Sequence, residues 1–416
     1  MVLPQQCISR RGMIRRMGAA GGMVMCSAPA LDALPAPSGP HVEFNVRAFG
    51  ARGDGAADDT TAIQTAIAAA SAAGGATIAF PSGVYMVSSP LQVLDNVRLC
   101  GAGRSSTIHA MKSNQIILSL GKCRGAIIES LRFTGAGRLG VAGRGAIWLT
   151  PERGGGPRDC MILNCWIEGV GTCGIVVGQA IGCLISGNHI DGTAEHGIYS
   201  SASQGCIFSN NVIRNAGRLG GVSTCVGIKV ADTTESTFNA NIVESPLTEG
   251  ILIESGTARC TVVGNVIHDT PQRTIRINDQ TSAIQITGNI LADAKTEAIR
   301  IFGGSGCSVM GNTITSARDT AIAIDGPARD ATIIGNTVAA GPANGWAMRI
   351  DGSGHFVCGN HIMKCRFGIQ VAPSARSIRM VSNQITATER AYSDVEDDSV
   401  TIDGHEGVPH QRGRHQ

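Results

Sequence analysis

Two stretches decide the fold: residues 260–277 read CTVVGNVIHDTPQRTIRI, and residues 284–301 read IQITGNILADAKTEAIRI. They align without a gap, and each runs through alternating apolar residues, Gly-Asn, a second apolar segment, a polar turn and a closing x-Ile-Arg-Ile. Short, alternating segments rich in β-branched residues are typical of strands, and no 3.6-residue apolar rhythm indicates a helix here. A repeat that holds about three strands predicts a stack of similar coils.

The same repeat extends outward over residues 160–390. One Asn marks each coil, and the steps between these markers are 23 or 24 residues, with a single step of 30. The markers are Asn188, Asn211, Asn241, Asn265, Asn289, Asn312, Asn336, Asn360 and Asn383. Leucine-rich repeats share this period, but their L-x-x-L-x-L core is absent from the sequence. We therefore predict an all-β fold, a single-stranded, right-handed parallel β-helix of about twelve coils whose strands stack ~4.8 Å apart.

The repeated polar positions have structural explanations. Asn tolerates left-handed backbone geometry at a sharp turn, and its side chain can bond to the next coil, so the markers predict a ladder rather than a site. Cys recurs five residues before the marker position, which predicts buried free thiols. These residues are Cys160, Cys183, Cys206, Cys260 and Cys307. A disulfide among the first three is the alternative.

An amphipathic helix is expected before the first coils. Residues 44–55 (FNVRAFGARGDG) lead into residues 58–70 (DDTTAIQTAIAAA), which have a helical apolar face. Asp58 or Asp59 caps the helix, and Gly74 begins the pair of glycines that ends it. The apolar face consists of Ile63, Ala66, Ile67 and Ala70. A helix laid across the open end of a solenoid covers its core.

The segment from residue 44 to about residue 108 resembles the opening of pectate-lyase-superfamily proteins, which include polygalacturonase-like enzymes and phage tailspikes. The resemblance implies a right-handed β-helix and a bias toward polysaccharide substrates. It carries over no catalytic residue, because Asp54, Asp58 and Asp59 serve as turn and cap residues in this interpretation.

Composition excludes several classes of protein. The 416 residues include 34 Lys+Arg and 32 Asp+Glu, for a net charge of +2, and 43% are hydrophobic. This apolar content excludes general disorder, and the near-neutral charge gives no broad footprint for nucleic acid. No stretch reaches the ~20 apolar residues of a membrane helix, so we expect no membrane insertion.

The first 30 residues resemble a twin-arginine export signal. Ser9-Arg10-Arg11 precedes a weakly apolar stretch at residues 17–25, and Ala28-Pro29-Ala30 supplies a small-residue cleavage site. A basic N-terminal arm is the alternative. A β-helix repeat chain with this signal also resembles a group of twin-arginine-exported repeat proteins. We expect the twin-arginine export machinery as a partner and a periplasmic or extracellular location.

The expected domain organisation has four parts. They are a signal peptide (1–30), a linker (31–42), a β-helix domain (43–403) with a cap region (43–75) and regular coils (160–390), and a disordered tail (404–416). The sequence does not predict the oligomeric state.

A candidate binding face follows from the closing strands. Both Ile side chains of each strand point inward, so the residue between them faces outward. Along the rod these residues are Trp148, Val176, Tyr199, Lys229, Leu252, Arg276, Arg300, Ala323, Arg349 and Gln370. Aromatic and cationic residues suit sugar stacking and carboxylate recognition. We predict that an acidic polysaccharide binds Trp148, Arg300 and Arg349, together with Glu254 and Asn278 two positions further along their strands.

The hypothesis for activity is lyase-type β-elimination at a uronic-acid sugar. This reaction must neutralise the carboxylate, remove the C5 proton and protonate the leaving oxygen. Arg276 and Arg300 are the candidates to clamp the carboxylate. Lys229 is the candidate base, a role that requires neighbouring positive charge to favour its neutral form. Tyr199 or His196 is the candidate acid.

Two alternatives stand beside the lyase. A polygalacturonase-like hydrolase needs clustered aspartates, but adjacent pairs occur only at Asp58-Asp59 and Asp397-Asp398. The Asp-Pro-His-Asp run of alginate epimerases is absent as well. The second alternative is a non-catalytic protein that binds polysaccharide or serves as a structural part of the cell envelope, which the small outward residues favour.

No metal site or cofactor is predicted. Glu254, Asn278 and Asp279 offer three oxygen ligands on adjacent coils. Calcium usually takes six to eight oxygen ligands, so this set falls short.

Overall fold

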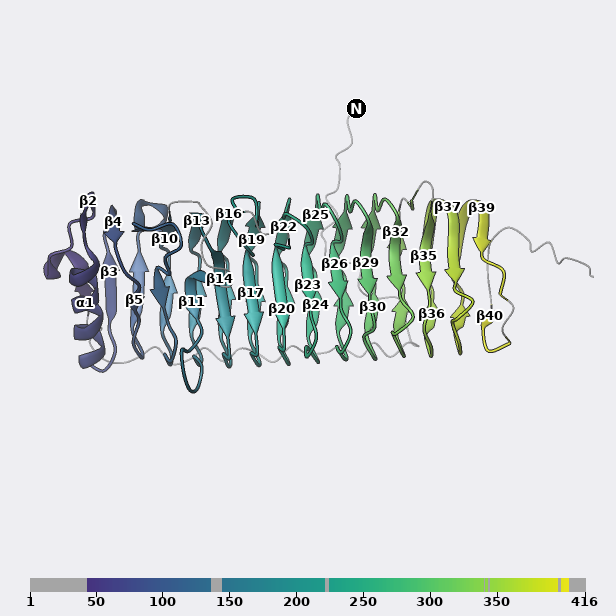
Figure 1. Cartoon of the computed structure of the whole chain (residues 1–416), viewed down its shortest axis with the longest axis horizontal. Helices are drawn as coiled ribbons and strands as arrows, with labels where there is room; N and C mark the ends of the chain where they lie inside the picture. The colour runs from purple at the N-terminus through teal and green to yellow at the C-terminus, as the bar shows by residue number, and fades with distance from the viewer. Residues whose placement is uncertain are drawn as a thin grey trace, which may run out of the picture. The chain divides into compact units, whose positions relative to one another are not determined.

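The computed structural model describes residues 43–135, 144–220, 224–339, 341–342, 345–395 and 398–403. These residues form a right-handed parallel β-helix of about 14 turns (Figure 1), which confirms the predicted fold class. One sheet has 15 strands and the other has 25. The coil number exceeds the expected twelve because the coils before residue 160 lack the marker Asn. The predicted signal peptide, the whole of the predicted linker and the C-terminal tail lie outside the described residues.

A single coil shows how the sequence builds the rod. Strands β24 (Thr261–Val263), β25 (Val266–His268) and β26 (Ile275–Ile277) follow one another around the coil. Each pairs in parallel with its counterpart one coil later, β27 (Gln285–Thr287), β28 (Ile290–Ala292) and β29 (Glu297–Ile301). Alternate side chains, such as Val262, Ile267 and Ile275, are fully buried in the core. Stacked aliphatic residues of this kind supply the hydrophobic stabilisation of the fold.

The Asn markers form a continuous ladder of buried hydrogen bonds. The Asn265 Nδ2 donates to the Phe238 carbonyl at 3.0 Å and to the Asn289 Oδ1 at 2.9 Å. The backbone N–H of Asn241 donates to the Asn265 Oδ1 at 2.9 Å. The expectation that these asparagines are left-handed is wrong, because the positive φ belongs to the residue before each marker, such as Gly264 with φ +64°. The marker itself is the hydrogen-bonding member of the turn.

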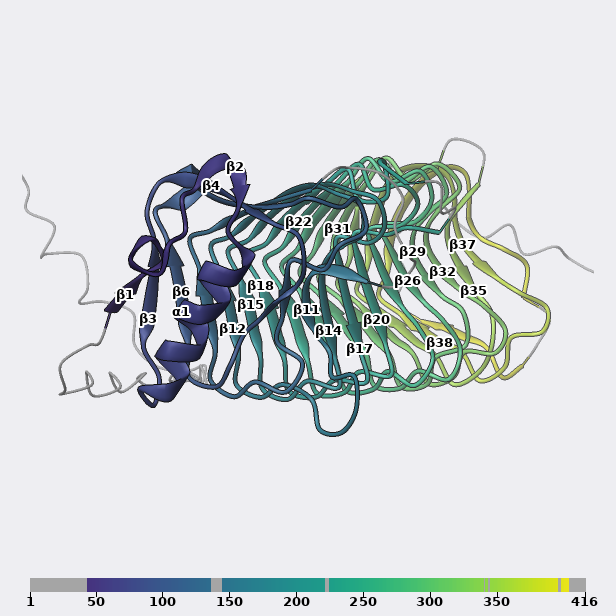
Figure 2. The same cartoon turned by 60° about the vertical axis from the view of Figure 1, so that its left-hand side comes forward.

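Helix α1 (Thr60–Ala72) lies across the N-terminal end of the coils (Figure 2). Its buried residues are Ile63, Ala66, Ile67 and Ala70, as the apolar pattern predicts. The two candidate caps divide their roles. Asp58 accepts a hydrogen bond from the backbone N–H of Thr60, whereas Asp59 accepts from the backbone N–H groups of Arg52 and Gly53. Asp59 therefore ties the preceding loop to the helix, and the helix closes the core.

All twelve cysteines within the described residues are free thiols, and ten of them are buried. Cys160, Cys183 and Cys206 stack in successive coils without a disulfide, so the alternative of a bridge is wrong.

Among the described residues, no helix is long and apolar enough to cross a membrane.

Candidate functional site

One face of the β-helix carries the predicted row of outward residues, which we call the central row. It lies on strands β11 (Gly145–Leu149), β14 (Cys173–Gly178), β17 (Ile198–Ser201), β20 (Ile228–Ala231), β23 (Ile251–Ile253), β26, β29, β32 (Thr320–Ile324), β35 (Trp346–Ile350) and β37 (His361–Val371). The central row pairs in register from strand to strand, from Trp148 through Val176, Tyr199, Lys229, Leu252, Arg276, Arg300, Ala323 and Arg349 to Gln370. The spacing in the sequence therefore places these side chains in line along the rod.

Three members of the central row are buried rather than solvent-facing. Val176 is 2% exposed, Leu252 is 7% exposed and Ala323 is fully buried. Strands ~4.8 Å apart bring long side chains over a short neighbour, which covers it. These three residues point outward as predicted, but the expectation that they face solvent is wrong.

A second row lies on the same face, and we call it the outer row; of its members the sequence analysis had named only His196. Its members stand two residues before the first inward Ile of each closing strand. They are His196, Val226, Glu249, Arg273, Glu297, Thr320, Trp346 and Phe367. The residue that follows each of them turns into the core, since a Cβ at Gly250 would lie 2.3 Å from the Ile267 side chain. The sequence signal for this row is a charged residue directly before the Gly or Ala that precedes the inward Ile, as in Glu249-Gly-Ile and Glu297-Ala-Ile.

The outer row neutralises the arginines in the middle of the face. Arg276 lies 3.2 Å from Glu249, and Arg273 lies 3.3 Å from the same carboxylate. Arg273 also lies 3.0 Å from Glu297. Glu249 is 4% exposed and Glu297 is 7% exposed, so both carboxylates depend on these arginines for their burial. Arg276 is therefore not the free carboxylate clamp that the sequence predicted.

Arg300 is likewise held within the face. Its Nε lies 2.6 Å from Asp325, and its Nη1 lies 3.5 Å from Glu297. Arg349 pairs with Asp325 at 3.2 Å. Burial opposes the charge on Glu297, but a backbone N–H and the neighbouring arginines outweigh it and hold the pKa of Glu297 below its usual value. Arg273, Arg276, Arg300 and Arg349 thus face Glu249, Glu297 and Asp325, so these arginines are paired within the chain.

His196, Tyr199 and Lys229 form a cluster on two adjacent coils. The rings of His196 and Tyr199 lie 5.7 Å apart, and the Lys229 Nζ lies 5.4 Å from the centre of the Tyr199 ring. Burial, together with the charge of Lys229, lowers the pKa of His196 to about 3. The His196 Nδ1 accepts a hydrogen bond from the backbone N–H of Val226 at 3.1 Å, so the proton of the neutral ring resides on Nε2.

Lys229 has a carboxylate as its partner rather than the expected positive charge. Its Nζ lies 3.3 Å from Glu254, which is on the next coil. Its contact is thus a carboxylate and not a second cation, and Lys229 is placed to stabilise an anion rather than to act as a base. Because Glu254 is paired with Lys229, it is not the free substrate-binding carboxylate that the sequence predicted.

A buried carboxylate lies behind the cluster. Glu195 is 4% exposed, and the Cys173 thiol donates to its Oε2 at 3.3 Å. Burial, reinforced by the charge of Glu195, raises the pKa of Cys173 well above its ordinary value. Glu195 precedes His196 in the sequence, and that adjacency was the signal for its place beside the cluster.

The remaining predicted site residues are spread along the face. Trp148 lies two coils before Tyr199, and Arg349 lies at the far end of the charged region. Asn278 directly follows the last residue of β26, and its Oδ1 atom is buried. Asp279 accepts a hydrogen bond from Ser255 at 3.3 Å. With Glu254 paired to Lys229, these residues do not converge on a calcium ion.

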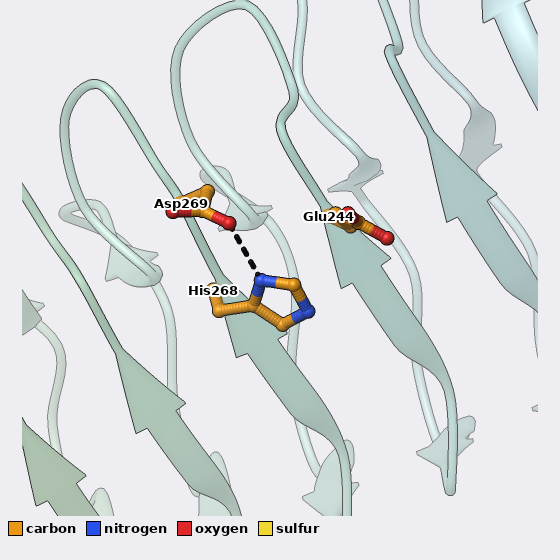
Figure 3. Close-up of side chains that lie close together, drawn as sticks. All are labelled: Glu244, His268 and Asp269. Atoms are coloured by element: carbon orange, nitrogen blue, oxygen red, sulfur yellow. Dashed lines mark hydrogen bonds and ion pairs between the residues drawn. The ribbon is translucent and has the colours of Figure 1, made fainter.

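A different group of side chains resembles a metal-ligand set. Glu244, His268 and Asp269 have ligand atoms within 4.8 Å of one another (Figure 3). However, His268 bonds Asp269 at 2.9 Å, and Glu244 pairs with Arg214 at 2.8 Å. The group is solvent-accessible and already satisfied internally, so it provides no argument for a metal.

The fold agrees with the comparisons to known protein families. Residues 43–276, more than half of the chain, match the family described as rhamnogalacturonase A/epimerase, pectate lyase-like. The chain belongs to this family. Residues 273–406 match the right-handed β-helix region family.

Individual relatives are similar over a short segment. Mannuronan C5-epimerase AlgE3 of Azotobacter vinelandii is 49% identical over 77 residues, which is 17% of this chain and 4% of the epimerase. Alginate lyase 7 of the same organism is 49% identical over 74 residues, which is 16% of this chain and 9% of the lyase. The matched segment therefore spans less than a tenth of either relative.

Solved structures are similar over most of the coils. The A-module of Azotobacter vinelandii mannuronan C5-epimerase AlgE4 has a TM-score of 0.69 at 21% identity, covering 87% of this chain and all of the module. The surface adhesin PfbA of Streptococcus pneumoniae has a TM-score of 0.64 at 15% identity, covering 84% of this chain and 91% of the adhesin. At these identities the likeness establishes the fold.

Proposed function

We propose that this protein acts on a uronic-acid polysaccharide by abstracting the C5 proton, with lyase-type β-elimination as the outcome. The observation that carries the proposal is the cluster of His196, Tyr199 and Lys229 on a face that also carries partly exposed arginines. Tyrosine, neutral histidine and lysine are groups that transfer protons or stabilise developing negative charge. The named activities of the relatives, mannuronan C5-epimerase and alginate lyase, support the same substrate class.

The contacts within the cluster assign a role to each residue. Tyr199 is the proton-transfer group, since a histidine with a pKa of about 3 is too weak a base. The Lys229 ammonium, 5.4 Å from the Tyr199 ring, stabilises the phenolate that abstraction requires. His196 donates through Nε2–H to the substrate. Arg276, 33% exposed beside Glu249, provides positive charge for the substrate carboxylate.

The elimination balances without a cofactor. The C5–H bond breaks and its proton passes to the Tyr199 oxygen, which leaves an anion delocalised into the sugar carboxylate. The C4–O bond then breaks, a C4=C5 double bond forms, and the leaving oxygen takes a proton from Tyr199. An epimerase shares the first step but returns a proton to the opposite face of C5. Cleavage of the C4–O bond therefore distinguishes a lyase from an epimerase.

Export is the second part of the proposal. We infer a periplasmic or extracellular location reached through the twin-arginine machinery, on the basis of Arg10 and Arg11 and the small-residue site that follows them. Replacing both arginines by lysine is expected to retain the protein in the cytoplasm. Cell fractionation measures this, and unchanged export of the double variant would refute it.

The competing function is polysaccharide binding without catalysis. Two observations favour it: Arg276 and Arg300 are paired with the chain's own carboxylates, and a surface adhesin shares the fold. A screen against pectate, alginate, rhamnogalacturonan and glycosaminoglycans separates the candidates. New ultraviolet absorbance with new reducing ends indicates a lyase, reducing ends alone indicate a hydrolase, and retention without either product indicates a binding protein.

A further inference from the structure

An aromatic pair lies at the far end of the same face from the Tyr199 cluster. Trp346 and Phe367 are register partners on β35 and β37, and their ring centres lie 5.1 Å apart at 31°. Both rings are half-buried. Arg366 lies over the Phe367 ring at 5.0 Å and pairs with Glu389. The pair is therefore held in place by its neighbours while part of its surface stays open to solvent.

The aromatic pair continues the outer row rather than belonging to the core. Trp346 precedes the inward Met348 by two residues, as Glu249 precedes Ile251. Arg349 follows on the same strand in the central row, with a side chain that is 38% exposed. The positively charged stretch thus ends in an aromatic surface with a cation beside it.

The distance from the cluster to this pair sets a length for the occupant. Six strand steps separate β17 from β35, through β20, β23, β26, β29 and β32. At ~4.8 Å a step the separation is roughly 29 Å along the rod. A pyranose unit of an extended chain advances by about one such step, so about six sugars would connect the two places.

We infer that Trp346, Phe367 and Arg349 form a distal subsite that holds a uronate unit of a chain whose reacting sugar lies at Tyr199. The apolar face of a pyranose stacks on the aromatic rings, and Arg349 faces its carboxylate. The occupant is one anionic polysaccharide, since the central row between the two places carries Lys229, Arg276 and Arg300. The inference rests on the proposed function, and it adds a preference for chains longer than about six sugars.

The test compares short and long substrates in a set of matched variants. Binding of purified uronate tetramers and of chains of at least ten units is measured by calorimetry, beside turnover of both. The variants are Trp346→Leu, Trp346→Tyr, Phe367→Leu and, as a control from another face, Trp166→Phe on β13 (Trp166–Val170). Thermal unfolding of each variant establishes that it is folded.

The subsite requires Trp346→Leu and Phe367→Leu to weaken binding of long chains about tenfold and leave the tetramer unchanged. Trp346→Tyr, which keeps an aromatic face, restores most of the affinity, and Trp166→Phe changes neither. If the wild type and both leucine variants bound long chains with equal affinity, the distal subsite would be overturned. Turnover of the tetramer in the same experiment would still support the proposed function. A wild type that neither binds nor converts any uronate would overturn the proposed function and the subsite with it.

Discussion

Tyr199 and Lys229 are register partners on adjacent coils, and the Lys229 Nζ lies 5.4 Å from the centre of the Tyr199 ring. A cation so placed stabilises negative charge that develops nearby in a transition state. His196 lies in the same coil as Tyr199, and the centres of their two rings are 5.7 Å apart. This arrangement joins a proton-transfer group, a cation and a neutral donor on one face, and it carries the proposed chemistry.

Replacing Tyr199 by Phe should abolish proton transfer while keeping the binding face intact. We expect kcat on a uronan to fall by about 10²–10⁴, with little change in KM. Gln285→Ala, at an exposed position of β27 in the other sheet, is the control and should keep full turnover. Substantial turnover by Tyr199→Phe would show that another residue moves the C5 proton.

His196 should make the fold less stable in acid. Its folded pKa is about 3, whereas an unfolded histidine has a pKa of about 6.5. Between these values the unfolded chain binds more protons, so the free energy of unfolding falls as pH is lowered from about 6.5 toward about 3. Urea midpoints of wild type and His196→Gln at pH 7 and pH 4 measure this. The wild type should lose more stability than the variant, and equal losses would contradict the assignment.

Breaking one member of the Asn ladder should destabilise the whole rod. Asn265→Ala removes the acceptor for Asn241 and the donor to the Phe238 carbonyl, and these groups are buried. We expect a loss of about 3 kcal/mol in the free energy of unfolding. The exposed Gln285→Ala on β27 is the control, with a change near zero. Equal urea midpoints for the two variants would be inconsistent with a structural ladder.

Removing the charge of Glu249 should lower the free energy of unfolding and raise the affinity for an anionic polymer. Glu249→Gln leaves Arg273 and Arg276 without this carboxylate, so the free energy of unfolding should fall by about 3 kcal/mol. The freed arginines should raise the affinity for an anionic polymer several-fold, with a steeper dependence on salt. Arg98→Gln, at an exposed ion pair with Glu129, should change neither quantity appreciably. An unchanged salt dependence in Glu249→Gln would mean that Arg276 does not reach the polymer.

The buried thiols should be chemically inert until the protein unfolds. Cys165 is fully buried, and burial raises its pKa to about 12. Peptide mapping after alkylation at pH 8 should find little modification at this residue in the native state and full modification in urea. Cys100, which is partly exposed, is the internal comparison. Native labelling of Cys165 at the rate of Cys100 would contradict the packing of this coil.

The fold was predictable because each coil repeats the same physical solution. The marker Asn, the paired inward Ile residues and the Gly or Ala before them each satisfy a local requirement that recurs at one spacing. Register then follows from the pattern, which is why the central row from Trp148 to Gln370 could be aligned from the sequence. The cap helix was equally clear, since its apolar face has a helical period and Gly74 ends it.

The electrostatics of the face were not predictable from that pattern. Outward residues were identified from the Ile-x-Ile core of each closing strand, and the outer row lies two residues ahead of that core, as Glu297 does at the start of β29. Glu249 and Glu297 therefore went unnoticed, and Arg276 and Arg300 were taken to be free. The partner of Lys229 also depends on a contact between coils, where Glu254 from the next coil meets it at 3.3 Å.

The most direct test of the central claim is solvent-deuterium exchange at C5 during incubation with a polyuronate in heavy water. Nuclear magnetic resonance of the sugar and ultraviolet absorbance of C4–C5 double bonds are followed together. The account predicts that the wild type produces either deuterium at C5 or new unsaturated ends, and that Tyr199→Phe produces neither. Binding of the polymer by the wild type without either product would contradict proton abstraction and identify the face as a site that only binds.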